Sequence, residues 1–274
     1  MSAAAAVLAA VLVITDDEPG DSAKNAADQA QPSQPGAGAP TGGADGTGGS
    51  GDSGDDDADT GGSDGSGSDG SGSGALVKPA NTSGANGTTV LIGKKGAGHT
   101  LDVYTDLRCP PCARFEQGAG PTLRKDIKNG TYQASFHFGT FLDKNLKGSG
   151  SKNALSALGA ALNVSTDAFL DYKAALLSEE HHPEESTDSF ASDAFLLEVA
   201  GDVPALKDSA AFRGAVGKGT YDRWAQEMSS AFDRSGVSQT PALKLDGTEL
   251  TGSGGSVPLT ATEFTEAVND QLND

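Results

Sequence analysis

The stretch Thr105–Gln117, TDLRCPPCARFEQ, holds both cysteines of the 274-residue chain, Cys109 and Cys112, with Pro110 and Pro111 between them. Proline is tolerated in the first turn of a helix, because its missing N–H would have no partner there. The two prolines therefore predict that a helix begins at this point. Two cysteines in this arrangement can form a small disulfide or bind a metal ion, so the motif raises a question of chemistry as well as of fold.

Strands are predicted on both sides of this helix. Thr88–Lys94 and His99–Leu107 are rich in β-branched and apolar residues and precede it. The helix itself is expected to bend at Pro121 and to end at Asn129–Gly130, because glycine readily adopts the left-handed conformation that terminates helices. Thr131–Phe141 follows, with large side chains at every second position, and reads as the next strand.

Residues from about 149 to 235 change to helical periodicity, which predicts an inserted block of four or five helices. Asp188 is a plausible helix cap within it, and the aromatic residues are expected in its core. A β-hairpin turning at Asp246–Gly247 follows, and then a final helix, where Thr260 and Glu263 have capping-box spacing. The apolar stripes of the block include Leu155, Leu158 and Leu162; Phe190, Ala194 and Leu197; and Tyr221, Trp224, Met228 and Phe232.

Charge and composition separate the chain into two parts. The formal net charge is -19, which disfavours a nucleic-acid partner. Residues 1–75 carry 13 acidic residues and one basic residue, Lys24. Thr41–Gly74 consists almost entirely of Gly, Ser, Asp and Thr, so it has no large apolar side chain to bury. We therefore expect a disordered linker over residues 17–80 and a folded domain over residues 81–274.

The N-terminal segment, residues 1–16, contains an unbroken apolar run from Ala3 to Ile14. As a helix this run would span roughly 18 Å, short of the hydrocarbon core of about 30 Å, so it fits a signal segment better than a full span. No Lys or Arg precedes it, which leaves a disordered Ala-rich start as the alternative. We expect an extracytoplasmic protein, secreted or anchored by this segment, and such compartments preserve disulfides.

The chemistry of the cysteine pair has three interpretations. A zinc site needs four ligands, and no histidine has a zinc-finger spacing to the pair, so we expect no metal. A purely structural disulfide would close too small a loop to stabilise much. A redox role fits best: Cys109 lies where the helix N-terminus favours a thiolate, and Cys112 would be the buried resolving thiol. The four histidines are His99, His137, His181 and His182.

The prolines also limit the stabilisation of the thiolate, because residues 110 and 111 have no N–H to donate toward the Cys109 sulfur. We therefore expect a pKa for Cys109 below the free value of about 8.5, but not at the extreme of about 3.5. This predicts a moderate redox potential rather than that of a very strong oxidant.

The motif YTDLRCPPC (Tyr104–Cys112) and the order of the elements resemble the DsbA-like branch of the thioredoxin-fold thiol–disulfide oxidoreductases. The resemblance covers roughly Thr88–Leu272. It implies an α/β thioredoxin fold with an inserted helical domain, preceded here by the disordered tether. It also implies that Pro241 is a cis-proline facing the cysteines, and that the backbone of Thr240 pairs with substrate.

Several positions depart from the family pattern or leave alternatives open. Pro111 stands where this branch usually has histidine, and Val103 where an acidic residue is frequent. Asp106 is either a proton relay or a solvated turn residue, and we favour the solvated residue. Arg108 either lowers the thiol pKa electrostatically or is merely exposed. The stretch SEEHHPEES (Ser178–Ser186) is expected to be a solvated loop rather than a metal site.

The expected function is an exported thiol–disulfide oxidoreductase that needs no cofactor beyond its own redox-active Cys109–Cys112 disulfide. Its partners would be cysteine-containing exported proteins and a membrane or envelope redox partner, and we expect a monomer. The direction of electron flow stays open. An isomerase is a second enzymatic hypothesis, although residues 1–75 are too polar to form the dimerisation domain that it would need. A tethered binding module with a structural or redox-idle CxxC is the alternative from another class.

Overall fold

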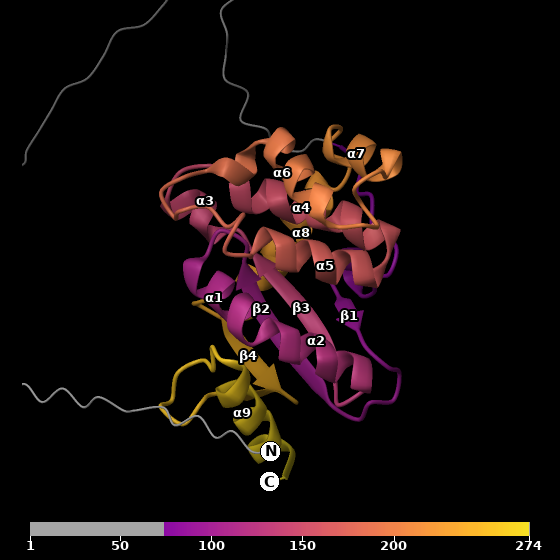
Figure 1. The fold of residues 1–274 in the computed structure, drawn as a ribbon. Helices are drawn as coiled ribbons and strands as arrows, with labels where there is room; N and C mark the ends of the chain where they lie inside the picture. The colour runs from indigo at the N-terminus through magenta and orange to yellow at the C-terminus, as the bar shows by residue number, and fades with distance from the viewer. Residues whose placement is uncertain (1–73, 274) are drawn as a thin grey trace, which may run out of the picture. The chain divides into compact units, whose positions relative to one another are not determined.

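A five-stranded mixed sheet, ordered β1–β3–β2–β4–β5, forms the centre of the computed structural model, which describes residues 74–273 (Figure 1). β2 and β3 are parallel, and every other neighbouring pair is antiparallel. Parallel neighbours require a crossover connection, and α1 (Pro110–Gly118) and α2 (Gly120–Asn129) supply it. The strands are β1 (Val90–Ile92), β2 (Thr100–Asp106), β3 (Gln133–Gly139), β4 (Ala242–Leu245) and β5 (Thr248–Glu249).

A helical block is inserted between β3 and β4, as the periodicity predicts, and lies at one end of the sheet (Figure 1). The short α3 (Phe141–Asn145) leads into it from β3. The block comprises α4 (Gly150–Val164), α5 (Thr166–Leu176), α6 (Asp193–Val199), α7 (Ala210–Val216) and α8 (Asp222–Asp233). Three 3-10 turns also lie outside the sheet: η1 (Ala85–Gly87), η2 (Ser189–Ala191) and η3 (Ala200–Asp202).

The two faces of the sheet are covered by different helices of the block. Phe136 and Phe138 of β3 both meet the ring of Phe169 on α5, with ring centroids 5.4 and 6.1 Å apart. On the opposite face, Tyr104 of β2 packs edge-on against Phe232 of α8 at 6.0 Å. Because side chains alternate along a strand, β2 and β3 are anchored to the block from both sides.

The expected aromatic core of the block is confirmed at α4 and α8. Trp224 is fully buried and donates its indole N–H to Gly87 O at 2.8 Å. Gly159 of α4 lies directly beneath the indole, where a Cβ atom would come within 2.8 Å of the ring. The absence of a side chain at Gly159 therefore allows these two helices to approach closely.

The local stop and turn signals are also confirmed. α1 and α2 are separated at Ala119, with Pro121 in the first turn of α2, and α2 ends at Gly130 with φ of 85°. The β4–β5 turn has positive φ at Asp246 (52°) and Gly247 (84°).

The final helix, α9 (Ala261–Asn273), begins with the expected capping box. The Glu263 N–H donates to the Thr260 hydroxyl, and the Thr260 N–H donates to the Glu263 carboxylate, both at 3.2 Å. Phe264 and Val268 form the buried face of this helix, and Leu272 packs partly buried against the core.

Contacts with the folded domain extend before the expected boundary at residue 81. Leu76 packs against the core, Pro79 is buried, and the Ala80 N–H donates to Asn163 Oδ1 at 3.0 Å. These contacts give residues 76–80 apolar and polar partners that no local pattern reveals, so these residues belong to the folded domain. The expected signal segment, residues 1–16, and the expected linker up to residue 73 lie outside the described residues. Within residues 74–273, none of the helices has the length and apolar character needed to cross a bilayer.

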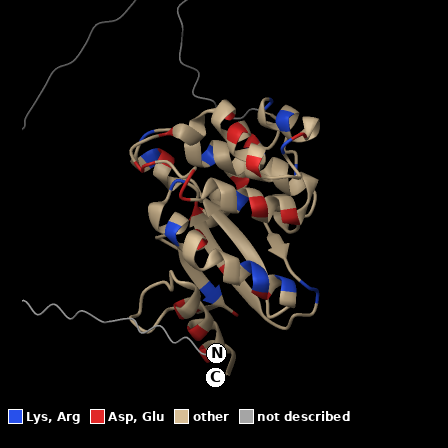
Figure 2. Ribbon diagram, viewed as in Figure 1, with Lys and Arg blue, Asp and Glu red and all other residues tan. Residues whose placement is uncertain are grey.

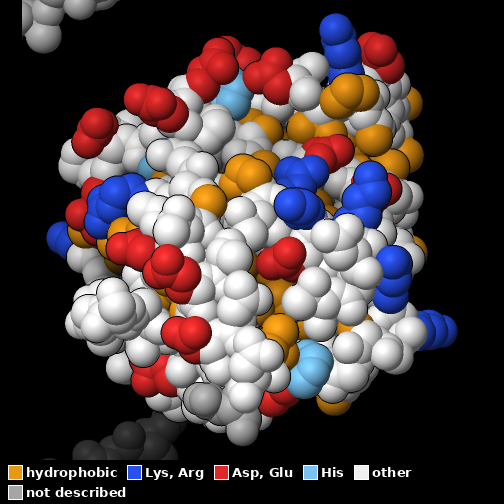
Figure 3. All heavy atoms as spheres, turned by 60° about the horizontal axis from the view of Figure 1, so that its bottom comes forward, with side chains coloured by type: hydrophobic (Ala, Val, Ile, Leu, Met, Phe, Trp, Pro, Cys, Tyr) orange, Lys and Arg blue, Asp and Glu red, His pale blue; other side chains and the backbone are white. Residues whose placement is uncertain are grey.

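Charge is unevenly distributed over the described domain. The charged side chains of α9 are all acidic, whereas α2 carries Arg124, Lys125 and Lys128 (Figure 2). In space-filling representation, Lys and Arg side chains gather toward one edge of the face shown in Figure 3. A pocket of about 690 Å³ between β1, α2 and α5 is lined by four basic residues, Lys94, Arg124, Lys125 and Lys128. Its lining contains neither cysteine, so this pocket is separate from the thiol chemistry.

Candidate active site

The cysteine motif forms the junction between β2 and α1. Cys109 is the N-cap of α1, with an extended backbone (φ −79°, ψ 116°), and Pro110 and Pro111 fill the first two helical positions. The Ala113 N–H donates to Cys109 O at 3.1 Å and begins the helical hydrogen bonding. Both cysteines are free thiols and both are buried, with 6 % of Cys109 and 1 % of Cys112 exposed. The helix therefore begins where the prolines predict.

The segment before β4 brings Thr240 and Pro241 against the thiols. The peptide bond between them is cis, and the Cys109 thiol donates to Thr240 O at 3.4 Å. Leu142 and Phe141 of α3 pack against the two cysteines and complete their apolar surroundings. Three segments that are distant in the sequence thus enclose one pair of sulfur atoms.

The two thiols have opposite pKa shifts. The pKa of Cys109 is lowered to about 7, first by a hydrogen bond from the Cys112 thiol, which outweighs the opposing effect of burial. The Thr240 hydroxyl has no partner in the described structure, and it lowers this pKa further because it can turn toward a thiolate. Burial, and then the hydrogen bond to Cys109, raise the pKa of Cys112 well above its usual value. Cys109 is therefore the thiol that ionises first.

Asp106 is not a solvated turn residue, so the favoured interpretation of this position is wrong. Its carboxylate is fully buried and accepts hydrogen bonds from the N–H groups of Arg108 (3.0 Å) and Leu142 (3.1 Å) and from the Ser151 hydroxyl (2.6 Å). Burial raises its pKa to about 6 despite these three donors. The cause of the error is α4, which covers the end of β2 and comes from 45 residues later in the chain.

Arg108 is likewise buried rather than exposed, with 2 % of its side chain accessible. Its guanidinium contacts Asp143 Oδ1 at 3.0 Å and Asp188 Oδ1 at 3.1 Å, while Nε has no partner among the described residues. Asp188 also accepts from the N–H groups of Ser149 and Gly150, both at 3.0 Å. Asp188 is by position the N-cap of η2, but its carboxylate binds the start of α4 instead, and Arg108 connects α4 to the cysteine turn.

A buried ion pair beneath α1 was missed by sequence reasoning. Glu116, one turn after Cys112, contacts Lys173 of α5, and 4 % and 2 % of their side chains are exposed. Lys173 also lies over the ring of Phe136, 5.5 Å from its centroid. Helical spacing from Cys112 indicates only that Glu116 faces the same side of α1, and no local signal identifies its partner.

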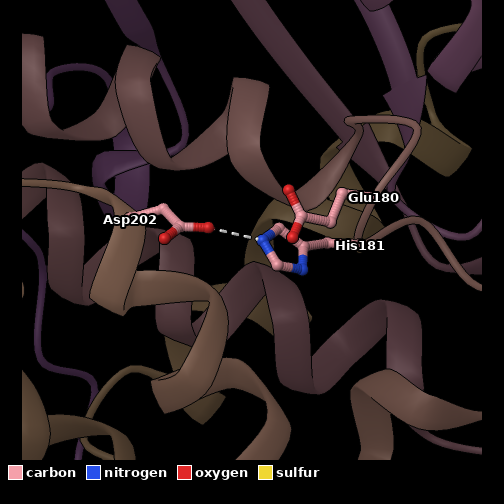
Figure 4. A group of neighbouring side chains, drawn as sticks. All are labelled: Glu180, His181 and Asp202. Atoms are coloured by element: carbon pink, nitrogen blue, oxygen red, sulfur yellow. Dashed lines mark hydrogen bonds and ion pairs between the residues drawn. The ribbon is translucent and has the colours of Figure 1, made fainter.

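The loop Ser178–Ser186 is only partly solvated. Its glutamates are exposed, as expected, but His181 and His182 are half-buried. His181 Nε2 contacts Asp202 Oδ2 at 2.7 Å, and the Glu180 carboxylate lies next to the imidazole in the view of Figure 4. Ligand atoms of these three residues lie within 4.8 Å of one another, a spacing that a cation could accept. We interpret the group as a His181–Asp202 hydrogen bond that holds this loop against η3.

Comparison with known proteins places the chain in a family. The profile of the thioredoxin family matches residues 85–270. Reduced DsbG, a disulfide bond oxidoreductase of Mycobacterium tuberculosis, is 25 % identical, with a TM-score of 0.55 over 68 % of this chain and 88 % of its own. Oxidised DsbA of the same organism is 24 % identical, with a TM-score of 0.55 over 68 % and 93 %.

Oxidised BdbD of Bacillus subtilis is 20 % identical, with a TM-score of 0.55 over 72 % of this chain and 97 % of its own. No curated protein sequence matches this chain significantly. The fold, the inserted helical block and these matches show that the chain belongs to the thioredoxin family, in its DsbA-like branch.

Proposed function

We propose that this chain is an exported thiol–disulfide oxidoreductase that acts on cysteine-containing exported proteins through Cys109 and Cys112. Membership of the DsbA-like branch supports the enzyme class. The observation that carries the proposal is the pairing of unequal thiols: the one with the lowered pKa caps a helix, beside a second thiol and the cis Thr240–Pro241 bond. A thiolate is the nucleophile in disulfide exchange, so this arrangement assigns the first step to Cys109.

In the reductase direction, the Cys109 thiolate attacks one sulfur of a substrate disulfide, and the other substrate sulfur leaves as a thiolate. Cys112 then loses its proton and attacks Cys109 in the mixed disulfide. This step releases the second substrate thiolate and leaves the protein with a Cys109–Cys112 disulfide. The oxidase direction is the reverse, in which a substrate thiolate attacks Cys109 and the protein becomes reduced.

The other parts of the proposal rest on the sequence. Two electrons move between sulfur atoms, so we propose that no metal or organic cofactor takes part. Residues 1–16 would direct export or anchor the protein, and a membrane or envelope redox partner would restore its working redox state. Fractionation of cells that express the full chain tests this: recovery of the protein outside the cytoplasm is expected, and purely cytoplasmic protein would contradict export.

Substrate trapping tests the enzymatic proposal most simply. In Cys112→Ser the resolving thiol is missing, so mixed disulfides with substrate proteins should accumulate through Cys109 and appear as reducible high-mass bands. Cys109→Ser is the matched control and should trap nothing. Equal trapping by both variants, or none by Cys112→Ser, would favour a binding module with a redox-idle CxxC.

A further inference from the structure

A pocket of about 350 Å³ lies beside the first turns of α1, where that helix faces the loop after α5. α1 contributes Pro110 and Arg114 to its lining, and the loop contributes Glu179, His182, Glu184 and Glu185. Pro110 directly follows Cys109, so the pocket adjoins the residue whose sulfur reacts with substrate. A group of a bound polypeptide close to its reacting cysteine can therefore enter this pocket.

The pocket is negatively charged at its rim. Glu179, Glu184 and Glu185 are exposed, and Arg114 is the only basic residue of the lining. Burial lowers the pKa of His182, so its imidazole is neutral near pH 7 and does not offset the carboxylates. Its Nε2 is buried without a partner in the described structure. The pocket thus combines exposed carboxylates with half-buried Pro110, Pro183 and imidazole surface.

The loop that carries these carboxylates is held in place by several contacts. Gln117 of α1 donates to Leu177 O at 2.9 Å, and the His182 N–H donates to Ser178 O at 3.0 Å. The His181–Asp202 pair fastens the same loop to η3 (Figure 4). A rim that is fixed before binding loses little conformational entropy on binding, which favours selectivity.

We propose that this pocket binds a lysine or arginine side chain located near the reactive cysteine of the protein substrate. This inference deepens the proposed function and rests on it. A long basic side chain fits both parts of the pocket, because its aliphatic stem can pack on the proline surface while its charged end reaches the carboxylates. Opposite charge at the rim also steers encounter, so the preference should appear mainly in the association rate.

Peptides that contain one cysteine, with Lys, Ser or Glu two residues away, test this preference. Each reduced peptide is mixed with the full-length protein in its Cys109–Cys112 disulfide form, and the second-order rate is measured at low salt. We expect the Lys peptide to react about fivefold faster than the Glu peptide, with the Ser peptide between them. The difference should nearly vanish in about 0.5 M salt, because exposed charges are screened.

Matched variants locate the effect. Glu184→Gln combined with Glu185→Gln should bring the rates of the Lys and Glu peptides to nearly the same value. Glu249→Gln combined with Glu266→Gln removes the same charge from exposed positions outside the pocket and should preserve the preference. Equal rates for the three peptides with the unaltered protein, or a preference that survives the pocket variant, would overturn the proposal.

A redox-independent measurement separates this inference from the proposed function. The same peptides with serine in place of cysteine are titrated into the protein, and amide chemical shifts are followed. The Lys peptide should shift the signals of Gln117 and His182, which both line the pocket, and the pocket variant should abolish these shifts. If no peptide is oxidised but these shifts appear, the proposed function fails and the pocket stands. If the shifts are absent, the pocket assignment is wrong.

Discussion

Two thiols of a single motif differ in acidity because their surroundings differ. Cys109 is placed so that the Cys112 thiol, the Cys112 N–H and the Thr240 hydroxyl all favour its thiolate. Asp106 and burial act against them, and the balance leaves the pKa near 7. The prolines remove two N–H groups that would otherwise help, which accounts for a moderate value rather than an extreme one.

This balance predicts the titration of the reduced protein. Thiolate absorbance should rise with a midpoint near pH 7, the value to which the pKa of Cys109 is lowered. Cys112→Ala removes the leading hydrogen-bond donor and should move the midpoint up by about one pH unit or more. Because the folded pKa lies below the unfolded value, the reduced protein should gain stability as pH rises from about 7 to about 9. An unchanged midpoint in Cys112→Ala would contradict the assignment.

Asp106 predicts the opposite pH dependence at lower pH. Its folded pKa of about 6 lies above the ordinary 3.8, so the folded state binds this proton more tightly than the unfolded state. Its contribution to the free energy of unfolding should therefore fall as pH rises from about 4 to about 6. Urea unfolding at several pH values measures this dependence. In Asp106→Asn, the part of the pH dependence of the free energy of unfolding that comes from Asp106 should be absent. A slope equal to that of the unaltered protein would show that Asp106 is not the titrating group.

The reacting residues can be identified from the local sequence, whereas the residues that contact them cannot. Cys109, the prolines and Pro241 could be found from a motif, from a rule about helix starts and from a family resemblance. The favoured interpretation of Asp106 was wrong, and the alternatives for Arg108 stayed open, because α4 and Asp188 bury these residues from about 40 to 80 residues further along the chain. The alternation of apolar and polar residues along β2 cannot show that these distant segments bury Asp106 and Arg108. His182 gave no signal either, since its burial depends on how the loop after α5 packs.

At the level of elements, the start of α4 depends on a carboxylate supplied from outside the helix. Asp188→Ala should destabilise the protein by about 2–4 kcal/mol, because it removes a helix cap and one carboxylate of a buried arginine. Asp171→Ala is the control: it breaks the partly exposed pair with Arg124 and should cost less than about 1 kcal/mol. Similar losses in the two variants, measured by denaturant unfolding, would contradict this account.

The packing of α4 on α8 gives a second test at this scale. Alanine is a better helix former than glycine, yet Gly159→Ala should cost about 1–3 kcal/mol because its Cβ would meet the Trp224 ring. Gly214→Ala in α7 has open space and should stabilise by about 0.5–1 kcal/mol. The same Gly→Ala change should therefore lower the free energy of unfolding at position 159 and raise it at position 214. Trp224 fluorescence should change only in Gly159→Ala. Stabilisation by both would show that α4 and α8 are not closely packed.

Helix and strand boundaries could be predicted where residues next to the boundary determine it. Gly130, the Asp246–Gly247 turn and the Thr260–Glu263 capping box work through contacts between near neighbours, so a local rule identifies them. Asp188 illustrates the limit, because its residue type indicates a cap but not which helix it caps.

For the whole molecule, the insertion of the helical block determines the environment of the thiols. α4 buries Asp106, α5 carries Lys173 beneath α1, and the loop after α5 forms the pocket beside Pro110. The same block therefore packs against the segment that carries the redox pair, and it supplies most of the pocket that we assign to the substrate. Element order could be predicted from periodicity, whereas these contacts depend on how the block packs on the sheet.

The redox potential of the Cys109–Cys112 couple, measured by equilibration of the purified protein with glutathione buffers, tests the central claim most directly. A thiol pKa near 7 resembles that of thioredoxin, so we expect a reversible two-electron couple between about −270 and about −180 mV. The position within this range will also indicate the preferred direction of electron flow. A value near −120 mV would contradict the moderate thiolate stabilisation, and a pair that fails to exchange with glutathione would contradict the redox function itself.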